Sequence, residues 1–383
     1  MKESKADSIA NERIPVPAIE ASPAVPVIHP RNYSFQVHPM TTSRQGATIA
    51  PAPPPAQFSA PASPVPLVSI DAGNAAVKIY DGRSYGLIRA LYAPIPDGAP
   101  TIQAVKNSPV VEVDGARYHV GQQASYYDTC QVAATGNKTE LIRLFVAAGL
   151  PTKSKTNQAD LVLCHHSHDL VREQITADLT GPFLFRRNGV GYSIDIRSVT
   201  VLDELFGSWA LCRNQGRLGS GLTLGLDLGC GTVLARLIDA NGITVRSLTS
   251  DKNGVLRLAY LIAQNSKLSQ PLRAHGITHP KVAAILEGLQ DGSHSYESTG
   301  ISWGDWWRPI RDRWFKSFIT STTAEFQAQM GMVDRILVTG GGANLVSDLV
   351  AGKPRFMIPD APHRANCIGN WQWVHAQRLG GAA

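Results

Sequence analysis

Two aspartates that are far apart in the chain stand at the same kind of place, where an apolar run ends and a glycine-containing corner begins. Asp71 follows the run at residues 67–70, and Asp227 follows the run at residues 222–226. Glycines allow backbone N–H groups to approach a ligand closely, and a carboxylate at the strand end faces whatever those groups hold. Phosphate with a divalent cation is the usual ligand of such a pairing, so phosphate chemistry is the first hypothesis for both segments.

The segments that position these aspartates share one design. Each has an apolar run, a glycine corner, a second apolar run and a turn pair, which is Asp-Gly in residues 67–82 and Asn-Gly in residues 222–242. Two β-hairpins of one design suggest a duplicated domain whose halves face each other across a cleft. The alternative is two unrelated Asp-x-Gly turns. A third element disfavours it, because residues 336–344, ILVTGGGAN, form a buried-strand run that ends in three glycines.

The composition describes a large folded protein without a membrane segment. At 383 residues and 43% hydrophobic residues, the chain can bury a sizeable core and is expected to fold as two lobes. No window offers the roughly 18 apolar residues that a membrane span needs, and the polar N-terminus lacks a signal-peptide core, so we expect a cytoplasmic protein. The five scattered cysteines argue against a disulfide framework, and a net charge of +6 permits nucleic-acid contact without arguing for it.

Residues 1–66 differ from the rest of the chain. They hold thirteen of the 25 prolines, set among Ala, Ser and Val. Such a stretch cannot bury enough apolar surface to offset its conformational entropy. We therefore expect a disordered, Pro-rich tail that could recruit a partner.

The remaining residues alternate strand-like and helix-like segments. Strands are expected in SYGLIRALYAPI, VVEVDGARYHVG, ADLVLCHH, PFLFRR and YSIDIRSVTVL, with helices over residues 138–150 and in HDLVREQITADL. Beyond the second hairpin, helices are expected around residues 255–262, from Lys281, and over residues 306–330. Strands early in each half and helices late in each half fit a repeated α/β lobe.

The three glycine motifs, in this order, resemble those of the actin-like ATPase superfamily, which also holds sugar kinases and heat-shock chaperones. Residues 67–82 look like its first phosphate motif, residues 222–242 like its second, and residues 336–344 like its adenosine motif. The segment RYHVGQQA and the ending PHRANCIGNWQWV are similar to the plasmid-segregation actins, the ParM/StbA group. The resemblance covers roughly residues 67–378.

The resemblance implies a fold class and a division of the chain. The fold would be α/β, a two-lobed actin-like (ribonuclease H-like, duplicated) ATPase fold with a central nucleotide cleft. Residues 67–204 would form the first lobe, completed by a C-terminal helix at about 364–383, and residues 205–363 would form the second.

The resemblance also implies a site for ATP and Mg²⁺. Asp71 and Asp227 would hold the cation from opposite lobes through waters, because Mg²⁺ keeps much of its hydration shell; each could instead be only a turn residue. Lys78 would neutralise phosphate charge, unless it is a solvated strand lysine. The remaining candidates would contribute backbone, the first six around the phosphates and the last four around the adenosine: Gly73, Asn74, Gly229, Cys230, Gly231, Thr232, Gly340, Gly341, Gly342 and Ala343.

Hydrolysis needs a group that orients water in line with the γ-phosphate. In the plasmid actins this residue falls just before the helix between the lobes, and Glu204 matches best, with Asp203 beside it. A helix-capping acid is the alternative. The sequence departs from the family at one point, because Val-Leu-Ala follows Thr232 where another acidic residue is usual. A hydrolytic role for a second carboxylate after Thr232 is therefore in doubt. Asp227 itself is present and stays a candidate catalytic residue.

Two further clusters have alternative interpretations. The run CHHSHD at residues 164–169 could suggest a metal, but strand residues alternate sides and no second ligand group has matching spacing, so a polar loop is favoured. Aromatics at helical spacing favour a lobe core over nucleic-acid stacking, with the interleaved arginines on the outer face. These residues are Trp306, Trp307, Trp314, Phe315 and Phe318, with Arg308, Arg311 and Arg313.

The leading functional hypothesis is an ATPase that polymerises head to tail into filaments and moves or partitions DNA through an adaptor protein. A kinase of sugars or small acids on the same fold is the rival, and it would need a carboxylate base beside its substrate. A third hypothesis is a scaffold that binds ATP without polymerising and recruits partners through the tail.

Overall fold

A computed structural model describes residues 65–99, 102–105, 107–133, 137–152 and 157–380. The predicted tail lies outside these residues except for Val65 and Pro66. Within the described ranges, no helix is both long and apolar enough to cross a membrane.

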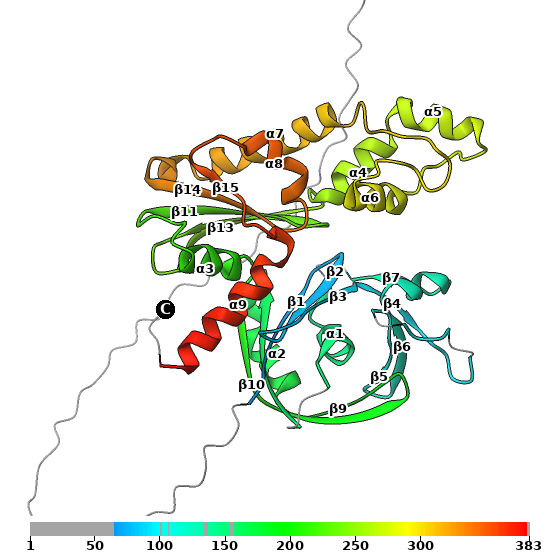
Figure 1. The fold of residues 1–383 in the computed structure, drawn as a ribbon, viewed down its shortest axis with the longest axis vertical. Coiled ribbons are helices and arrows are strands. Elements are labelled where there is room, and N and C mark those ends of the chain that lie inside the picture. Colours follow the sequence, from blue (N-terminus) through cyan, green and yellow to red (C-terminus); the bar gives the residue numbers. More distant parts are fainter. Residues whose placement is uncertain (1–64, 100–101, 106, 134–136, 153–156, 381–383) are drawn as a thin grey trace, which may run out of the picture. The chain divides into compact units, whose positions relative to one another are not determined.

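The first lobe is built on a ten-stranded sheet of order β3-β2-β1-β8-β10-β9-β5-β6-β4-β7 (Figure 1). Its centre, β1, β8 and β10, is parallel, and the neighbouring pairs are antiparallel. Its strands are β1 (Leu67–Ala72), β2 (Ala76–Tyr80), β3 (Tyr85–Arg89), β4 (Leu91–Pro94), β5 (Val110–Val113), β6 (Ala116–Val120), β7 (Gln131–Val132), β8 (Gln158–His165), β9 (Gly181–Arg187) and β10 (Val190–Asp203).

Helices cover the centre of this sheet. The helix α1 (Ile142–Gly149) packs on β1, β2, β5 and β9, and α2 (His168–Leu179) packs on β10, while the 3-10 helix η1 (Gln122–Tyr126) lies by β4 and β6. The C-terminal helix α9 (Pro362–Arg378) also contacts β1 and β2. Because it is covered in this way, β1 is buried along its whole length, which explains its nearly continuous apolar run.

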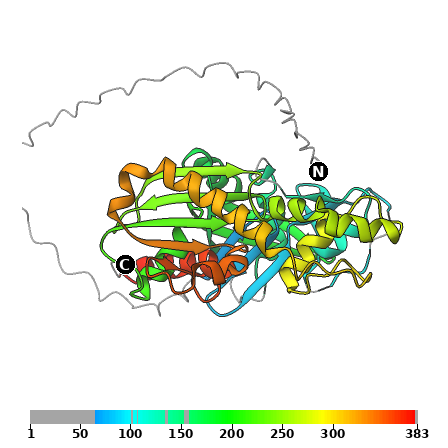
Figure 2. The same ribbon diagram turned by 90° about the horizontal axis from the view of Figure 1, so that it is seen from above.

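The second lobe is built on a five-stranded sheet of order β13-β12-β11-β14-β15. Its core joins one face of the sheet to several helices, of which the orange α7 crosses in front of the green strands in Figure 2. The elements are β11 (Leu222–Leu228), β12 (Thr232–Ile238), β13 (Thr244–Asp251), α4 (Val255–Ala263), α5 (Ser266–Ala274), α6 (Val282–Asp291), α7 (Arg308–Glu325), η3 (Gln327–Met332), β14 (Val333–Thr339), η4 (Ala343–Val346), α8 (Ser347–Val350) and β15 (Phe356–Met357).

Two crossing helices join the lobes, α3 (Phe206–Asn214) and α9. They meet at glycines, and a Cβ on Gly369 would lie 1.7 Å from the backbone oxygen of Gly207. Beside the crossing, the Ser208 hydroxyl lies 2.9 Å from that of Thr339, which donates to the Pro362 carbonyl. The crossing therefore ties α3 and α9 to the end of β14, directly before the predicted adenosine glycines.

The hairpins and most helices agree with the sequence predictions, with two differences in α7. This helix ends at Glu325 and a 3-10 helix continues the chain, so the expected helix over 306–330 is shorter. The aromatic residues Trp307, Trp314, Phe315 and Phe318 are buried in the lobe core, as predicted. The prediction that the arginines lie outside is wrong for Arg311, which is buried because it pairs with Asp348 at 2.8 Å.

Candidate functional site

The first predicted aspartate forms an ion pair within its own hairpin. The antiparallel register of β1 and β2 places Asp71 opposite Lys78, and Lys78 Nζ lies 2.8 Å from Asp71 Oδ2. Burial works to raise the pKa of Asp71, but the charge and hydrogen bond of Lys78, followed by the charge of Lys138, lower it below its ordinary value. Asp71 is therefore ionised, and Lys78 is its cation rather than a solvated strand lysine.

The second predicted aspartate is subject to charges from both lobes. Asp227 is half-buried near the end of β11, in register with Thr339 of β14. Burial and the negative charges of Glu204 and Asp71 raise the pKa of Asp227 to about 7, while Lys78 and Lys138 act in the opposite direction. Because the charges of Glu204, Asp71 and Lys78 all act on Asp227, these side chains lie around one place.

The glycine turns border the same place. Gly340 has a φ of +85°, and a Cβ there would lie 2.0 Å from Asp227 Oδ1, so both conformation and space require glycine. A Cβ on Gly231 would lie 2.5 Å from Asn74 Nδ2, which shows that the corners of the two hairpins face each other. The Gly342 amide donates to the Leu228 carbonyl at 2.8 Å. The three glycine motifs thus lie beside one another around Asp227.

Glu204 lies beside this site, and its two carboxylate oxygens have different surroundings. It follows β10, and Lys138 Nζ lies 3.3 Å from its Oε1. Its other oxygen, Oε2, is buried and has no hydrogen-bond partner among the described residues. Nδ1 of His166 lies 4.0 Å from that oxygen. A carboxylate with one oxygen anchored and one unpaired can accept a hydrogen bond from a ligand or a water.

The neighbouring Asp203 has a different environment. Arg236 Nε lies 3.1 Å from Asp203 Oδ2, and the Thr244 hydroxyl donates to the same oxygen at 3.1 Å. Burial raises the pKa of Asp203, although Arg236 works to lower it. Arg236 lies on β12 and also donates to the His166 carbonyl at 3.0 Å, so this pair connects the two lobes. Of the two adjacent acids, Glu204 is the one with an acceptor to spare.

Three site residues were not predicted from the sequence: Lys138, His166 and Arg236. Lys138 is buried at the start of an apolar helical segment, and a lone lysine there was the only available signal. Arg236 was a single cation in the buried run of β12. His166 belonged to a histidine cluster that was assigned to a polar loop. Their roles depend on neighbours distant in the sequence, which spacing does not reveal.

The histidine cluster does not form a metal centre within the described part of the chain, where no group of three or more His, Cys, Asp or Glu is arranged to hold an ion. The rings of His165 and His166 lie against each other at a tilt of 30°, with centroids 4.4 Å apart. Burial, together with the charges of His166 and Lys138, lowers the pKa of His165 to about 4. His165 is therefore neutral at physiological pH, and its Nδ1 accepts from the Ser167 amide.

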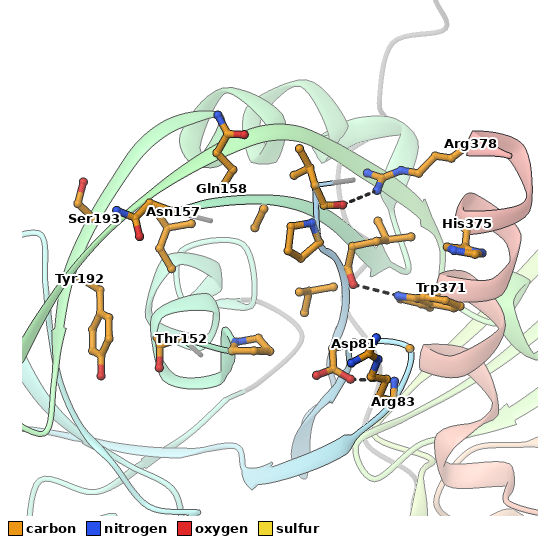
Figure 3. Close-up of a pocket in the computed structure, with 18 of the residues that line it drawn as sticks. Asp81, Arg83, Thr152, Asn157, Gln158, Tyr192, Ser193, Trp371, His375 and Arg378 are labelled. Carbon is orange, nitrogen blue, oxygen red and sulfur yellow. Dashed lines mark hydrogen bonds between the residues drawn. The ribbon is translucent and has the colours of Figure 1, made fainter. Parts of the chain in front are cut away.

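A cavity of about 900 Å³ lies elsewhere in the first lobe. It is lined by the beginnings of β1, β8 and β10 and by the end of α9, where the Trp371 indole donates to the Leu67 carbonyl at 2.9 Å (Figure 3). Asp71 lies near the other end of β1. None of the predicted site residues lines this cavity.

Comparison with known proteins identifies the fold. Residues 69–207 match the family model described as Actin like proteins N terminal domain. A crystal structure of Ta0583, an archaeal actin homologue, has a TM-score of 0.66 at 17% identity, covering 81% of this chain and 99% of that one. A ParM filament from Clostridium botulinum has a TM-score of 0.61 at 14% identity, covering 81% and 98%. The chain matches no curated protein sequence.

At these identities the solved structures show the fold, and the fold is that of actin-like proteins. Another relative, an apo psk41 ParM crystal structure, has a TM-score of 0.58 at 16% identity, covering 83% of this chain and 99% of that one. The archaeal homologue has also been solved in complex with ADP, with a TM-score of 0.65 at 19% identity and the same coverage. The chain has the actin-like fold, and residues 69–207 of its first lobe match the model of the N-terminal domain of actin-like proteins.

Proposed function

We propose that this protein binds and hydrolyses ATP and assembles into filaments that segregate DNA in the cytoplasm. The observation that carries the proposal is the convergence of Asp71, Lys78, Asp227 and Glu204 where the two glycine corners face each other. The ADP complex of the archaeal homologue supports a nucleotide as the ligand.

The residues fit a magnesium nucleotide. Burial and two neighbouring carboxylates, those of Glu204 and Asp71, raise the pKa of Asp227. A cation bound there would relieve the repulsion between these carboxylates. Asp71 and Asp227 would hold Mg²⁺ through waters, because this ion keeps several of its own waters and is usually bound by one or two carboxylates. When bound, the ion neutralises charge on the phosphate oxygens. Lys78 adds a second positive charge, and the glycine turns supply backbone N–H groups.

Glu204 is the proposed group that orients the attacking water. In the reaction the water oxygen forms a bond to the γ-phosphorus while the bond to the bridging oxygen breaks. The electron pair of that bond leaves on ADP, and the proton lost by water ends on inorganic phosphate. Because positioning supplies most of the catalysis of phosphoryl transfer, an anchored carboxylate beside the phosphates is sufficient for this role.

The filament part of the proposal rests on the fold. One similar structure is a ParM filament, and a head-to-tail contact that does not close generates such a polymer. DNA would be engaged indirectly through an adaptor protein, as the resemblance to the plasmid-segregation actins implies. Light scattering and sedimentation with ATP, with ADP and without nucleotide would test assembly. A protein that stays monomeric in all three would be an ATP-binding scaffold or a kinase instead.

The experiment that tests the nucleotide site compares Asp227→Asn with the wild type. This change preserves size but removes the charge proposed to hold the cation, so Mg²⁺-dependent ADP release should fall at least about tenfold, the scale of about 1.4 kcal/mol. Glu173→Gln, which removes an exposed charge on α2, is the matched control and should hydrolyse ATP normally. Wild-type turnover by Asp227→Asn would overturn the assignment.

A further inference from the structure

We propose that His166 is a positioning residue for ATP hydrolysis, holding the attacking water jointly with Glu204. The inference rests on the proposed function and adds a residue to its site. Nδ1 of His166 and Oε2 of Glu204 are both buried, have no hydrogen-bond partner among the described residues, and lie 4.0 Å apart at the site border.

The sheet fixes this juxtaposition. The strands β8 and β10 are parallel neighbours, and their register pairs His165 with Asp203 at the strand ends. His166 and Glu204 are therefore the next residues on each strand, and the Glu204 amide donates to the His165 carbonyl at 3.3 Å. Both side chains thus leave the same edge of the sheet from anchored backbone.

The separation fits one bridging water. His166 Nδ1 and Glu204 Oε2 are 4.0 Å apart, which is too long for a direct hydrogen bond. A water about 2.8 Å from each atom spans this gap and subtends roughly a right angle, close to the angle between its own hydrogens. Both atoms are buried and have no hydrogen-bond partner among the described residues, so the water would satisfy both.

Glu204 and His166 can each accept one hydrogen bond from the water. Lys138 occupies the other oxygen of Glu204 at 3.3 Å, which leaves Oε2 as the acceptor. Burial lowers the pKa of His166, so its ring is neutral at physiological pH and has one nitrogen free to accept. A water that donates one hydrogen to each group keeps its lone pairs for the γ-phosphorus.

His166 also compensates for a departure in the second hairpin. The residues after Thr232, where another acid is usual in the family, are the buried apolar Val233, Leu234 and Ala235. None of these three side chains is polar, so none of them can form a hydrogen bond to a water beside the phosphates. His166 offers a hydrogen-bonding atom from the first lobe instead. Its neighbour at this edge, Glu204, lies close enough to Asp227 to raise the pKa of Asp227.

The test compares His166→Leu, His166→Asn and His168→Leu with the wild type in single-turnover and steady-state ATP hydrolysis. Leu removes the acceptor, so kcat should fall about tenfold or more while the Kd for ATP stays within about threefold. Asn retains an acceptor near the position of Nδ1 and should recover most of the rate. His168→Leu removes a nearby imidazole, at the first residue of α2, and should retain the wild-type kcat.

The double variant Glu204→Gln/His166→Leu separates cooperation from independent effects. If both residues hold one water, the loss in the double variant should be much smaller than the product of the single losses. Wild-type kcat in His166→Leu would overturn the inference while leaving the proposed function intact. A loss of ATP affinity or of melting temperature in His166→Leu would make it a binding or structural residue. Absence of hydrolysis in the wild type would overturn the proposed function and this inference together.

Discussion

At the scale of single residues, two adjacent acids at one strand end serve different purposes. Asp203 is held by Arg236 and Thr244, which come from the second sheet, and so connects the lobes. Glu204 is anchored through one oxygen only. The difference follows from alternation at the strand end, because successive side chains point to opposite sides.

The pair of Asp203 and Arg236 leads to a stability prediction. Arg236→Met should lower the free energy of unfolding by about 3–5 kcal/mol, because it leaves a buried carboxylate without its cation. Urea unfolding would measure the change. Asp203→Asn/Arg236→Met removes both charges and should recover a large part of the loss. Equal stability of the single and double variants would show that the ion pair contributes no more than side-chain packing.

Sequence reasoning located the residues that occupy turns better than those that act across the sheet. Asp71, Asp227 and Gly340 were found because a strand end followed by glycine is a local pattern. Whether Glu204 or Asp203 faces the site could not be decided from their order in the chain. The ion pair of Lys138 with Glu204 joins residues 66 positions apart, which no local pattern records.

At the scale of elements, the hairpins and buried strands were predicted because their alternation and turn residues are local. The turn after β5 contains Asp114 at a φ of 53° and Gly115 at 76°, as an Asp-Gly hairpin requires. The buried position of Arg311 was not predicted, because it depends on Asp348 from another helix. The close crossing of α3 and α9 was not predicted either, since it depends on two glycines 162 positions apart in the printed sequence.

The helix crossing gives a prediction at this scale. Gly369→Ala would place a methyl group 1.7 Å from the Gly207 carbonyl oxygen, so the two helices must separate. Overpacking of this kind costs about 1–3 kcal/mol, which corresponds to a fall of roughly 2–10 °C in melting temperature. Gly331→Ala is the control, because a Cβ there meets nothing within 4 Å. Equal melting temperatures for the two variants would show that α3 and α9 accommodate the added methyl group without a loss of stability.

At the scale of the whole molecule, the residues of the candidate site come from both lobes. Asp71, Lys78, Lys138 and Glu204 come from the first sheet and its connections, and Asp227 and Gly340 come from the second. A ligand that contacts both sets would stabilise one arrangement of the lobes, and hydrolysis would change the contacts that it makes. This coupling is the physical basis for expecting that nucleotide state controls assembly.

The last prediction links Glu204 to the lifetime of filaments. Glu204→Gln keeps the size of the side chain but weakens its hold on water, so ATP hydrolysis should slow by about tenfold or more. Nucleotide affinity should stay within about threefold, since the lost interaction acts mainly in the transition state. Filaments assembled with ATP should then persist longer than those of the wild type, because the change that triggers disassembly comes later.

Phosphate release, nucleotide affinity and the decay of light scattering, measured on one preparation, would check this chain of effects. Glu173→Gln is again the control, since it removes an exposed carboxylate on α2, and its filaments should decay at the wild-type rate. Slow hydrolysis with unchanged decay would show that disassembly does not depend on hydrolysis. Unchanged hydrolysis would remove Glu204 from the reaction, and because Asp203 is already bound to Arg236, the water would have to be held by a residue outside this acidic pair.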